Sequence, residues 1–173
     1  MPQIRFFMDD AVCISLWRNV VVTDTAGLLD VNHMKTFEKA FRTVLLTHKE
    51  AVGLALLRPG TPVSSSEARA ESARFIKDLG PSLVRVAMVI EDKGILATMM
   101  RSVIRGLNVV MRNSTLIILA NQTEAIRSLL PNIGNVTDPA AAEKEFAQAL
   151  AEMRAGFRPG AQSTGPNPPA AGG

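Results

Sequence analysis

The pattern of apolar and polar residues changes period several times along the chain. Three short apolar runs have the profile of strands buried on both faces, since they are continuous and bounded by turn residues. These runs cover residues 51–57, 83–90 and 115–120. The segments between them repeat apolar residues every three or four positions, which is typical of amphipathic helices. The alternation predicts an α/β fold with a mainly parallel sheet.

The first 25 residues carry a different strand pattern. Residues 4–8 are apolar, Asp9-Asp10 is a turn signal, and residues 11–17 resume the β-prone pattern. Residues 20–25 either continue this strand past Arg18-Asn19 or pair as a further strand, and the pattern allows both. In either case we expect an antiparallel hairpin at one edge of the sheet.

Capping signals mark where several helices begin. Asp30 is a predicted N-cap, and Ser64 with Glu67 fits a capping box. Asp138-Pro139 combines an N-cap with proline at the first helical position. The helices expected from these signals and from the apolar period cover residues 30–48, 64–79, 95–111, 124–130 and 138–157. One face of the last helix carries Ala142, Phe146, Ala149, Leu150 and Met153.

Length and composition indicate one globular domain. The 173 residues suit a single core, which we place in residues 1–157. Residues 158–173 are rich in Pro, Gly and Ala and are predicted to be a disordered tail. Of all residues, 47% are hydrophobic and 20% are charged, which is close to a soluble globular average. A net charge of +3 is too small for a nucleic-acid-binding stripe, so no nucleic-acid partner is expected.

The sequence lacks the patterns of secreted and membrane proteins. The first residues do not form a signal peptide, and no apolar stretch approaches the roughly 18 residues that span a bilayer. We therefore expect a cytoplasmic protein without membrane insertion. Cys13 is the one cysteine, which excludes an internal disulfide and a thiolate metal cage.

Catalytic patterns are missing as well. Phosphate-binding glycine loops and a nucleophile elbow do not occur. His33 and His48 lie on one predicted helix about 22 Å apart, so they cannot bind the same metal. Asp9 and Asp10 are better explained as hairpin-turn residues than as paired catalytic carboxylates. No enzymatic activity, metal or cofactor is expected.

Two regions carry candidate binding residues. The first is the loop of residues 58–66, which holds Ser64, Ser65 and Ser66. It follows a buried strand, where open α/β sheets bind ligands, and its hydroxyls stand at a helix N-terminus, where phosphate is favoured. The alternative is that Ser64 only caps the helix.

The second region is the helix of residues 95–111, the most apolar of the five. Ile95, Met99, Val103, Leu107 and Val110 share one face, and Leu96, Met100 and Ile104 lie beside it. Methionines form deformable contact surfaces, so Met99, Met100, Arg101 and Arg105 are candidate partner-binding residues. A helix apolar on most sides is equally explained by a central, buried position.

The element order resembles the STAS fold, the fold of bacterial anti-sigma-factor antagonists. The resemblance covers about residues 4–131. It rests on the opening hairpin, the AVGLALL strand, the serine-bearing loop, the VRVAMVIED strand and the TEAIRSLL helix after TLIILA. It implies a STAS-like α/β sheet in a non-enzymatic regulatory module that docks another protein near residues 59–75.

The same resemblance implies a switch by phosphorylation at Ser64, Ser65 or Ser66. Here the sequence departs from the pattern, because Arg58-Pro59-Gly60-Thr61-Pro62 precedes the serines where an Asp is expected.

The sequence thus predicts a regulatory or scaffolding module that acts by protein–protein contact, with a possible homodimer through residues 95–111 or the final helix. The alternative is a domain that binds a lipid or nucleotide between sheet and helices.

Overall fold

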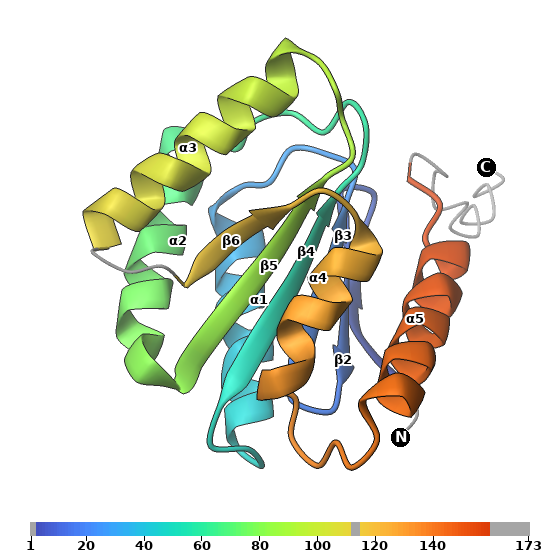
Figure 1. The fold of residues 1–173 in the computed structure, drawn as a ribbon. Helices are drawn as coiled ribbons and strands as arrows, with labels where there is room; N and C mark the ends of the chain where they lie inside the picture. The colour runs from blue at the N-terminus through green and yellow to red at the C-terminus, as the bar shows by residue number, and fades with distance from the viewer. Residues whose placement is uncertain (1–2, 112–114, 160–173) are drawn as a thin grey trace, which may run out of the picture.

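A computed structural model describes residues 3–111 and 115–159, and these form a six-stranded sheet flanked by five α-helices (Figure 1). The strands are β1 (Ile4–Met8), β2 (Val12–Trp17), β3 (Val20–Thr25), β4 (Ala51–Leu57), β5 (Leu83–Ile90) and β6 (Leu116–Leu119), and they lie in this order across the sheet. The first three strands pair antiparallel, and β3 to β6 pair parallel. The predicted α/β class and the antiparallel edge are confirmed.

The helices form one layer on each face of the sheet. They are α1 (Val31–Leu45), α2 (Ser66–Leu79), α3 (Ile95–Met111), α4 (Gln122–Leu129) and α5 (Pro139–Gly156), with short 3₁₀ turns at Gly80–Ser82 and Leu130–Asn132. From β3 to β6, each strand lies next to the one before it, always in the same direction across the sheet. Right-handed crossovers therefore place the three connecting helices, α1, α2 and α3, on the same face. The opposite face is covered by α4 and α5.

The run of residues 20–25 is a separate strand, which decides the alternative that the sequence left open. The chain reverses at Arg18, whose φ of 52° lies in the left-handed region. The Asn19 side chain then fixes this corner, because its Nδ2 donates to the carbonyls of Glu50 (3.2 Å) and Asn132 (2.9 Å). Its Oδ1 accepts from the amide of Gly134 at 3.0 Å.

The predicted caps of α1 and α5 are confirmed, and that of α2 is wrong by one residue. Asp30 and Asp138 each accept a hydrogen bond from the first turn of their helix. The N-cap of α2 is Ser65, whose side chain accepts from the Ala68 amide at 3.1 Å. Any of three consecutive serines can serve as a cap, so the local pattern did not fix the register.

The helix ends agree less closely with the pattern. α1 stops at Leu45, three residues before the expected end, and α4 begins two residues earlier than expected, at Gln122. Residues 158 and 159 are the only part of the predicted tail within the described residues. The rest of that tail, residues 160–173, lies outside them.

The α5 face of the sheet is closely packed. All the residues predicted for the inner stripe of α5 are buried, namely Ala142, Phe146, Ala149, Leu150 and Met153. Phe146 stacks on Trp17 of β2 with ring centroids 4.7 Å apart and planes 1° from parallel. The stacked pair fixes α5 against the antiparallel half of the sheet.

Burial of the side chains alternates along the two central strands, β4 and β5. The residues that face α4 and α5 are buried: Val52, Leu54, Leu56, Ala87 and Val89. Four of their neighbours on the α1–α3 face are only half-buried, namely Ala55, Leu57, Val86 and Met88, whereas Gly53 on the same face is buried. Central strands under a close-packed helical layer are normally buried on both faces. The layer of α1, α2 and α3 therefore leaves part of the sheet uncovered.

Candidate functional site

A cavity of about 160 Å³ lies between the sheet and the α1–α3 layer. Its walls are mainly apolar and include Phe37 and Phe41 of α1, Phe75 of α2, and Met100 and Ile104 of α3. The half-buried residues of β4 and β5 form its floor. Exposed Pro62 is also part of the lining, so the cavity reaches the surface beside the loop between β4 and α2.

Most polar groups of this cavity gather at one end, and Ser72 lies further along α2. Thr23 and Thr25 belong to the carboxyl-terminal half of β3, and the loop after β4 adds Thr61 and Ser64 to the lining. Arg69 joins them because α2 begins at this end of the sheet and runs back along it. We call these five residues the polar end of the cavity.

The opposite end is apolar. Leu83 and Leu116 line it from the beginnings of β5 and β6, and Val21 and Val86 line it from nearby strand positions. Gly53 belongs to this part of the floor, and a Cβ there would lie 3.1 Å from Phe41 and Val86. Along the strand direction, the lining of the cavity thus changes from mainly polar at one end to apolar at the other.

A buried hydroxyl faces the cavity. Thr23 lines it and is only 8% exposed, and no hydrogen bond among the described residues uses its hydroxyl. In the described chain, Nε2 of Gln3 is the one fully enclosed side-chain nitrogen or oxygen without a partner. The Thr23 hydroxyl therefore keeps open surface, and the open space beside it is the cavity. Buried polar groups are usually paired, so an open hydroxyl here indicates room for a partner.

Arg69 carries the one charge among the described residues that line the cavity. Its Nη1 donates to the carbonyl of Ser64, and it forms no ion pair within the described chain. Its charge contributes to lowering the pKa of Glu67, after the larger effects of hydrogen bonds to the Glu67 amide and the Ser65 and Ser66 side chains. Glu67 is exposed and does not line the cavity.

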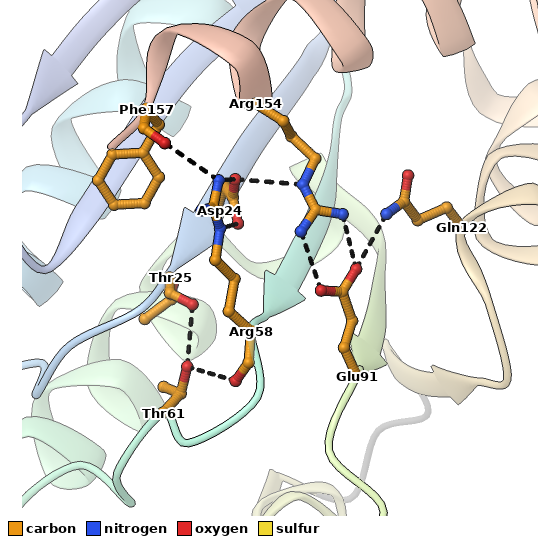
Figure 2. A network of polar contacts seen from close by, with 8 residues as sticks. All are labelled: Asp24, Thr25, Arg58, Thr61, Glu91, Gln122, Arg154 and Phe157. Atoms are coloured by element: carbon orange, nitrogen blue, oxygen red, sulfur yellow. Dashed lines mark hydrogen bonds and ion pairs between the residues drawn. The ribbon is translucent and has the colours of Figure 1, made fainter. Parts of the chain in front are cut away.

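A second polar cluster lies on the opposite face, at the carboxyl ends of the parallel strands (Figure 2). Its centre is Asp24 of β3, which is 0% exposed. Asp24 accepts from Arg58 Nε at 2.9 Å and from Arg58 Nη2 at 2.6 Å, a bidentate arrangement. Arg154 of α5 approaches the same carboxylate, with its Nε 3.4 Å from Oδ2.

Arg154 also extends this cluster to β5 and α4. Its Nη1 and Nη2 donate to the two carboxylate oxygens of Glu91, at 2.7 and 2.9 Å, and Gln122 donates to the same group at 2.9 Å. Burial opposes ionisation of Glu91, but these hydrogen bonds outweigh it and hold the pKa of Glu91 below its usual value. We call Asp24, Arg58, Glu91, Gln122 and Arg154 the carboxyl-edge network.

This network occupies the place where open α/β sheets commonly bind ligands. Here the chain itself fills that place, because Arg58 donates to the Phe157 carbonyl at 3.4 Å and lies 4.8 Å from the centre of its ring. Thr61 closes the adjacent loop, with its hydroxyl 2.9 Å from the Thr25 carbonyl and 2.7 Å from that of Arg58. The charges of the network are paired with each other, so its arrangement is that of a structural clamp for the end of α5.

The predicted serine loop lies at the mouth of the cavity. Ser64 lines the cavity, Ser65 caps α2, and Ser66 is exposed. Phosphorylation of this loop stays a prediction.

The predicted partner-binding residues of α3 divide between two environments. Met100 is buried and lines the cavity, so it is not a surface contact residue. Met99 and Arg105 are exposed and Arg101 is half-buried. α5 lies on the opposite face of the sheet and does not cover α3 (Figure 1).

The exposed apolar side chains of α3 include two members of the face that the sequence groups together. Ile95 is 84% exposed and Met99 53%, and Val109 is 77% exposed as well. Among the α3 side chains that the structure describes, Ala97, Met100 and Ile104 are buried in the core. The apolar stripe of α5 packs on the chain's own sheet. A homodimer through α3 or α5 stays a prediction.

Several site residues were missed by the sequence reasoning. Thr23, Asp24 and Thr25 form a polar triplet in an otherwise β-branched apolar strand, and a polar group in a central strand is a signal of special pairing. Arg69 gave no comparable signal, since surface arginines are common in helices. The sequence did not indicate a contact between Asp9 and His33. In the structure, His33 Nε2 lies 2.8 Å from Asp9 Oδ2 and joins the β1–β2 turn to α1.

Comparisons with protein-family models, with curated proteins and with solved structures find no match.

Within residues 3–111 and 115–159, no helix has the length and apolar character needed to cross a membrane. The same part of the chain holds no group of three His, Cys, Asp or Glu side chains that could bind a metal ion. Cys13 is buried in the α5 face, and burial raises the pKa of its thiol.

Proposed function

We propose that this chain is a non-enzymatic binding module that holds a small, mainly apolar molecule between the sheet and α1–α3. The observation that carries the proposal is the cavity of about 160 Å³ with its open Thr23 hydroxyl. Sites for small molecules are typically concave and apolar, with a few polar groups that orient the ligand.

The cavity volume limits the size of the ligand. An engineered protein cavity of about 150 Å³ with apolar walls stays dry and binds benzene. The similar volume here suits a ring or short chain of about six carbons at the apolar end. Met34, Met88 and Met100 line the cavity, and methionine side chains adapt to ligands of different shape at low cost.

The test compares benzene binding by the unaltered chain and by Ala55→Leu. Ala55 lies in the cavity floor, so a leucine there fills the space that the ligand needs. Ala70→Leu is the matched control, because Ala70 is exposed on α2. We expect benzene to shift amide NMR signals of β3, β4 and α2 in the unaltered chain and in the control, but not in Ala55→Leu. Absence of binding to the unaltered chain would contradict the proposal.

A second candidate function is contact with another protein through α3. It is supported by the exposed apolar side chains Ile95, Met99 and Val109 on a helix that carries Arg101 and Arg105 but no acidic residue. Charge complementarity favours a partner that presents apolar side chains flanked by carboxylates. This candidate keeps the regulatory or scaffolding role that the STAS resemblance implies, but through α3 rather than near residues 59–75.

The protein contact is tested by comparing the partners retained by Met99→Asp and by Leu46→Asp. Both substitutions place a carboxylate at an exposed apolar position, but Leu46 lies at the end of α1. We expect a specific partner to be lost from Met99→Asp alone. Equal retention by the two variants would exclude α3 as the contact surface.

A further inference from the structure

We propose that the ligand of the cavity is an amphipathic monocarboxylate whose carboxylate binds at the polar end, against Arg69. This inference rests on the proposed binding function and specifies the chemical class of its ligand.

The charge at the mouth favours an anion. Arg69 is the one charged residue in the described lining, and its recorded hydrogen bond uses Nη1 alone. A guanidinium has five N–H donors, and its remaining donors suit a carboxylate. Arg69 is half-buried, so an ion pair here is less screened by water than one on the open surface. The N-terminus of α2 lies at the same end and adds a favourable partial charge.

The hydroxyls supply a second, independent reason for a polar head group at this end. Thr23 and Thr25 line the cavity, both residues are buried, and no hydrogen bond among the described residues uses either side-chain hydroxyl. A carboxylate accepts hydrogen bonds from hydroxyl donors and from a guanidinium, whereas an ammonium group would be repelled by Arg69. The polar end therefore matches a carboxylate better than an amine.

The rest of the cavity determines the tail of the ligand. From the polar end the lining changes to Val21, Phe41, Leu83, Ile104 and Leu116, which offer no hydrogen bond from their side chains. A tail of about six carbons suits the volume, as for the benzene-binding cavity of similar size. Hexanoate is thus the simplest probe of this class.

The experiment measures the affinity of three probes that share a six-carbon tail: hexanoate, 1-hexanol and hexylamine. Titrations followed by NMR use the unaltered chain, Arg69→Gln, Arg69→Lys and Lys77→Gln. Lys77 lies exposed on the same helix and outside the cavity lining, so its variant controls for the loss of one positive charge. Binding of 1-hexanol to Arg69→Gln shows whether the cavity stays intact in that variant.

We expect hexanoate to bind tightest to the unaltered chain. Arg69→Gln should weaken hexanoate binding about tenfold, which is the size expected for one lost charged hydrogen bond, and leave 1-hexanol binding unchanged. Arg69→Lys should retain part of the affinity for hexanoate, and Lys77→Gln all of it.

Other results would overturn the inference in distinguishable ways. If 1-hexanol or hexylamine binds the unaltered chain as tightly as hexanoate, the ligand class is wrong and the binding function stands. Equal hexanoate affinity in Arg69→Gln and in the unaltered chain would exclude Arg69 as the carboxylate site. If none of the three probes binds, the proposed binding function fails together with this inference.

Discussion

The two faces of the sheet use the same strands for different purposes. On the α4–α5 face, alternate strand residues are buried, Trp17 stacks on Phe146, and the carboxyl-edge network pairs its charges at short range. On the α1–α3 face, four residues of β4 and β5 are half-buried over a cavity, and no described residue pairs with the Thr23 hydroxyl.

The difference shows where this fold can accommodate a ligand. Close packing and paired charges make one face rigid, because any inserted group must displace atoms that are already in contact. The other face loses some packing energy at the cavity, which a bound molecule can restore. A small α/β domain can thus keep its stability on one side of a sheet and its binding capacity on the other.

The largest expected effect is the loss of the Asp24 carboxylate. Asp24→Ala leaves Arg58 without its buried counter-charge, while Arg154 keeps Glu91, and the loss costs about 3–5 kcal/mol of the free energy of unfolding. Urea denaturation measures this cost. Asp78→Ala is the control, because Asp78 forms an exposed pair with Arg74, and exposed pairs contribute little to stability. Equal costs for the two variants would show that the carboxyl-edge network is not a clamp.

The same substitution on the two faces tests the comparison directly. Ala87→Leu inserts a larger side chain into the packed α4–α5 face and should cost about 1–3 kcal/mol of the free energy of unfolding. Ala55→Leu enters the cavity on the other face and should cost less than about 1 kcal/mol or stabilise the fold. Thermal unfolding measures both. Similar costs at the two positions would mean that the α1–α3 face is as closely packed as the other.

Acid should weaken the α5 face before it affects the cavity lining. The pKa of Glu91 is lower in the fold than in the unfolded chain, so its contribution to stability is present above about pH 4.3 and is lost as the pH falls through the folded pKa. Trp17 is the one tryptophan, and its fluorescence reports the stacking of α5. Glu91→Gln should reduce this pH dependence. A fluorescence change with the same pH dependence in both proteins would contradict the role of Glu91.

The smallest expected effect concerns the open hydroxyl. Thr23→Val keeps the shape of the side chain and removes a buried hydroxyl that pairs with no described residue, so the free chain should be unchanged or more stable by about 1 kcal/mol. Thr43→Val is a control, since the Thr43 hydroxyl donates to the Lys39 carbonyl at 2.8 Å on an exposed surface. Calorimetric unfolding compares the stability of the two variants, of which only Thr43→Val loses a hydrogen bond. Clear destabilisation by Thr23→Val would mean that the hydroxyl is already paired.

Much of the fold was predictable because local patterns and packing agree. The three buried strands follow apolar runs with clear turn residues, and the stripe of α5 follows a period that its burial confirms. Asp30 and Asp138 each have one obvious capping role, so their helices start where expected. In the serine loop three equivalent caps are adjacent, and only the tertiary position of α2 selects Ser65.

The candidate site was only partly predictable. The serine loop and the helix of residues 95–111 were recognised as special, and the structure brings Ser64 and Met100 to the same cavity. The cavity itself depends on how three helices pack on the sheet, which no local pattern records. The sequence left open whether α3 is buried or a contact surface, because an apolar helix with several possible stripes does not specify which one is buried.

The carboxyl-edge network has a consequence for the order of folding. Arg58 and the carbonyl of Phe157 are 99 positions apart, and Arg18 and Glu145 on the same face are 127 positions apart. Contacts between such distant positions require the closure of long loops, which costs chain entropy before the contacts stabilise the fold. Until α5 docks, the apolar surface around Trp17 stays bare. A chain cut before residue 139 therefore exposes this surface, which favours aggregation.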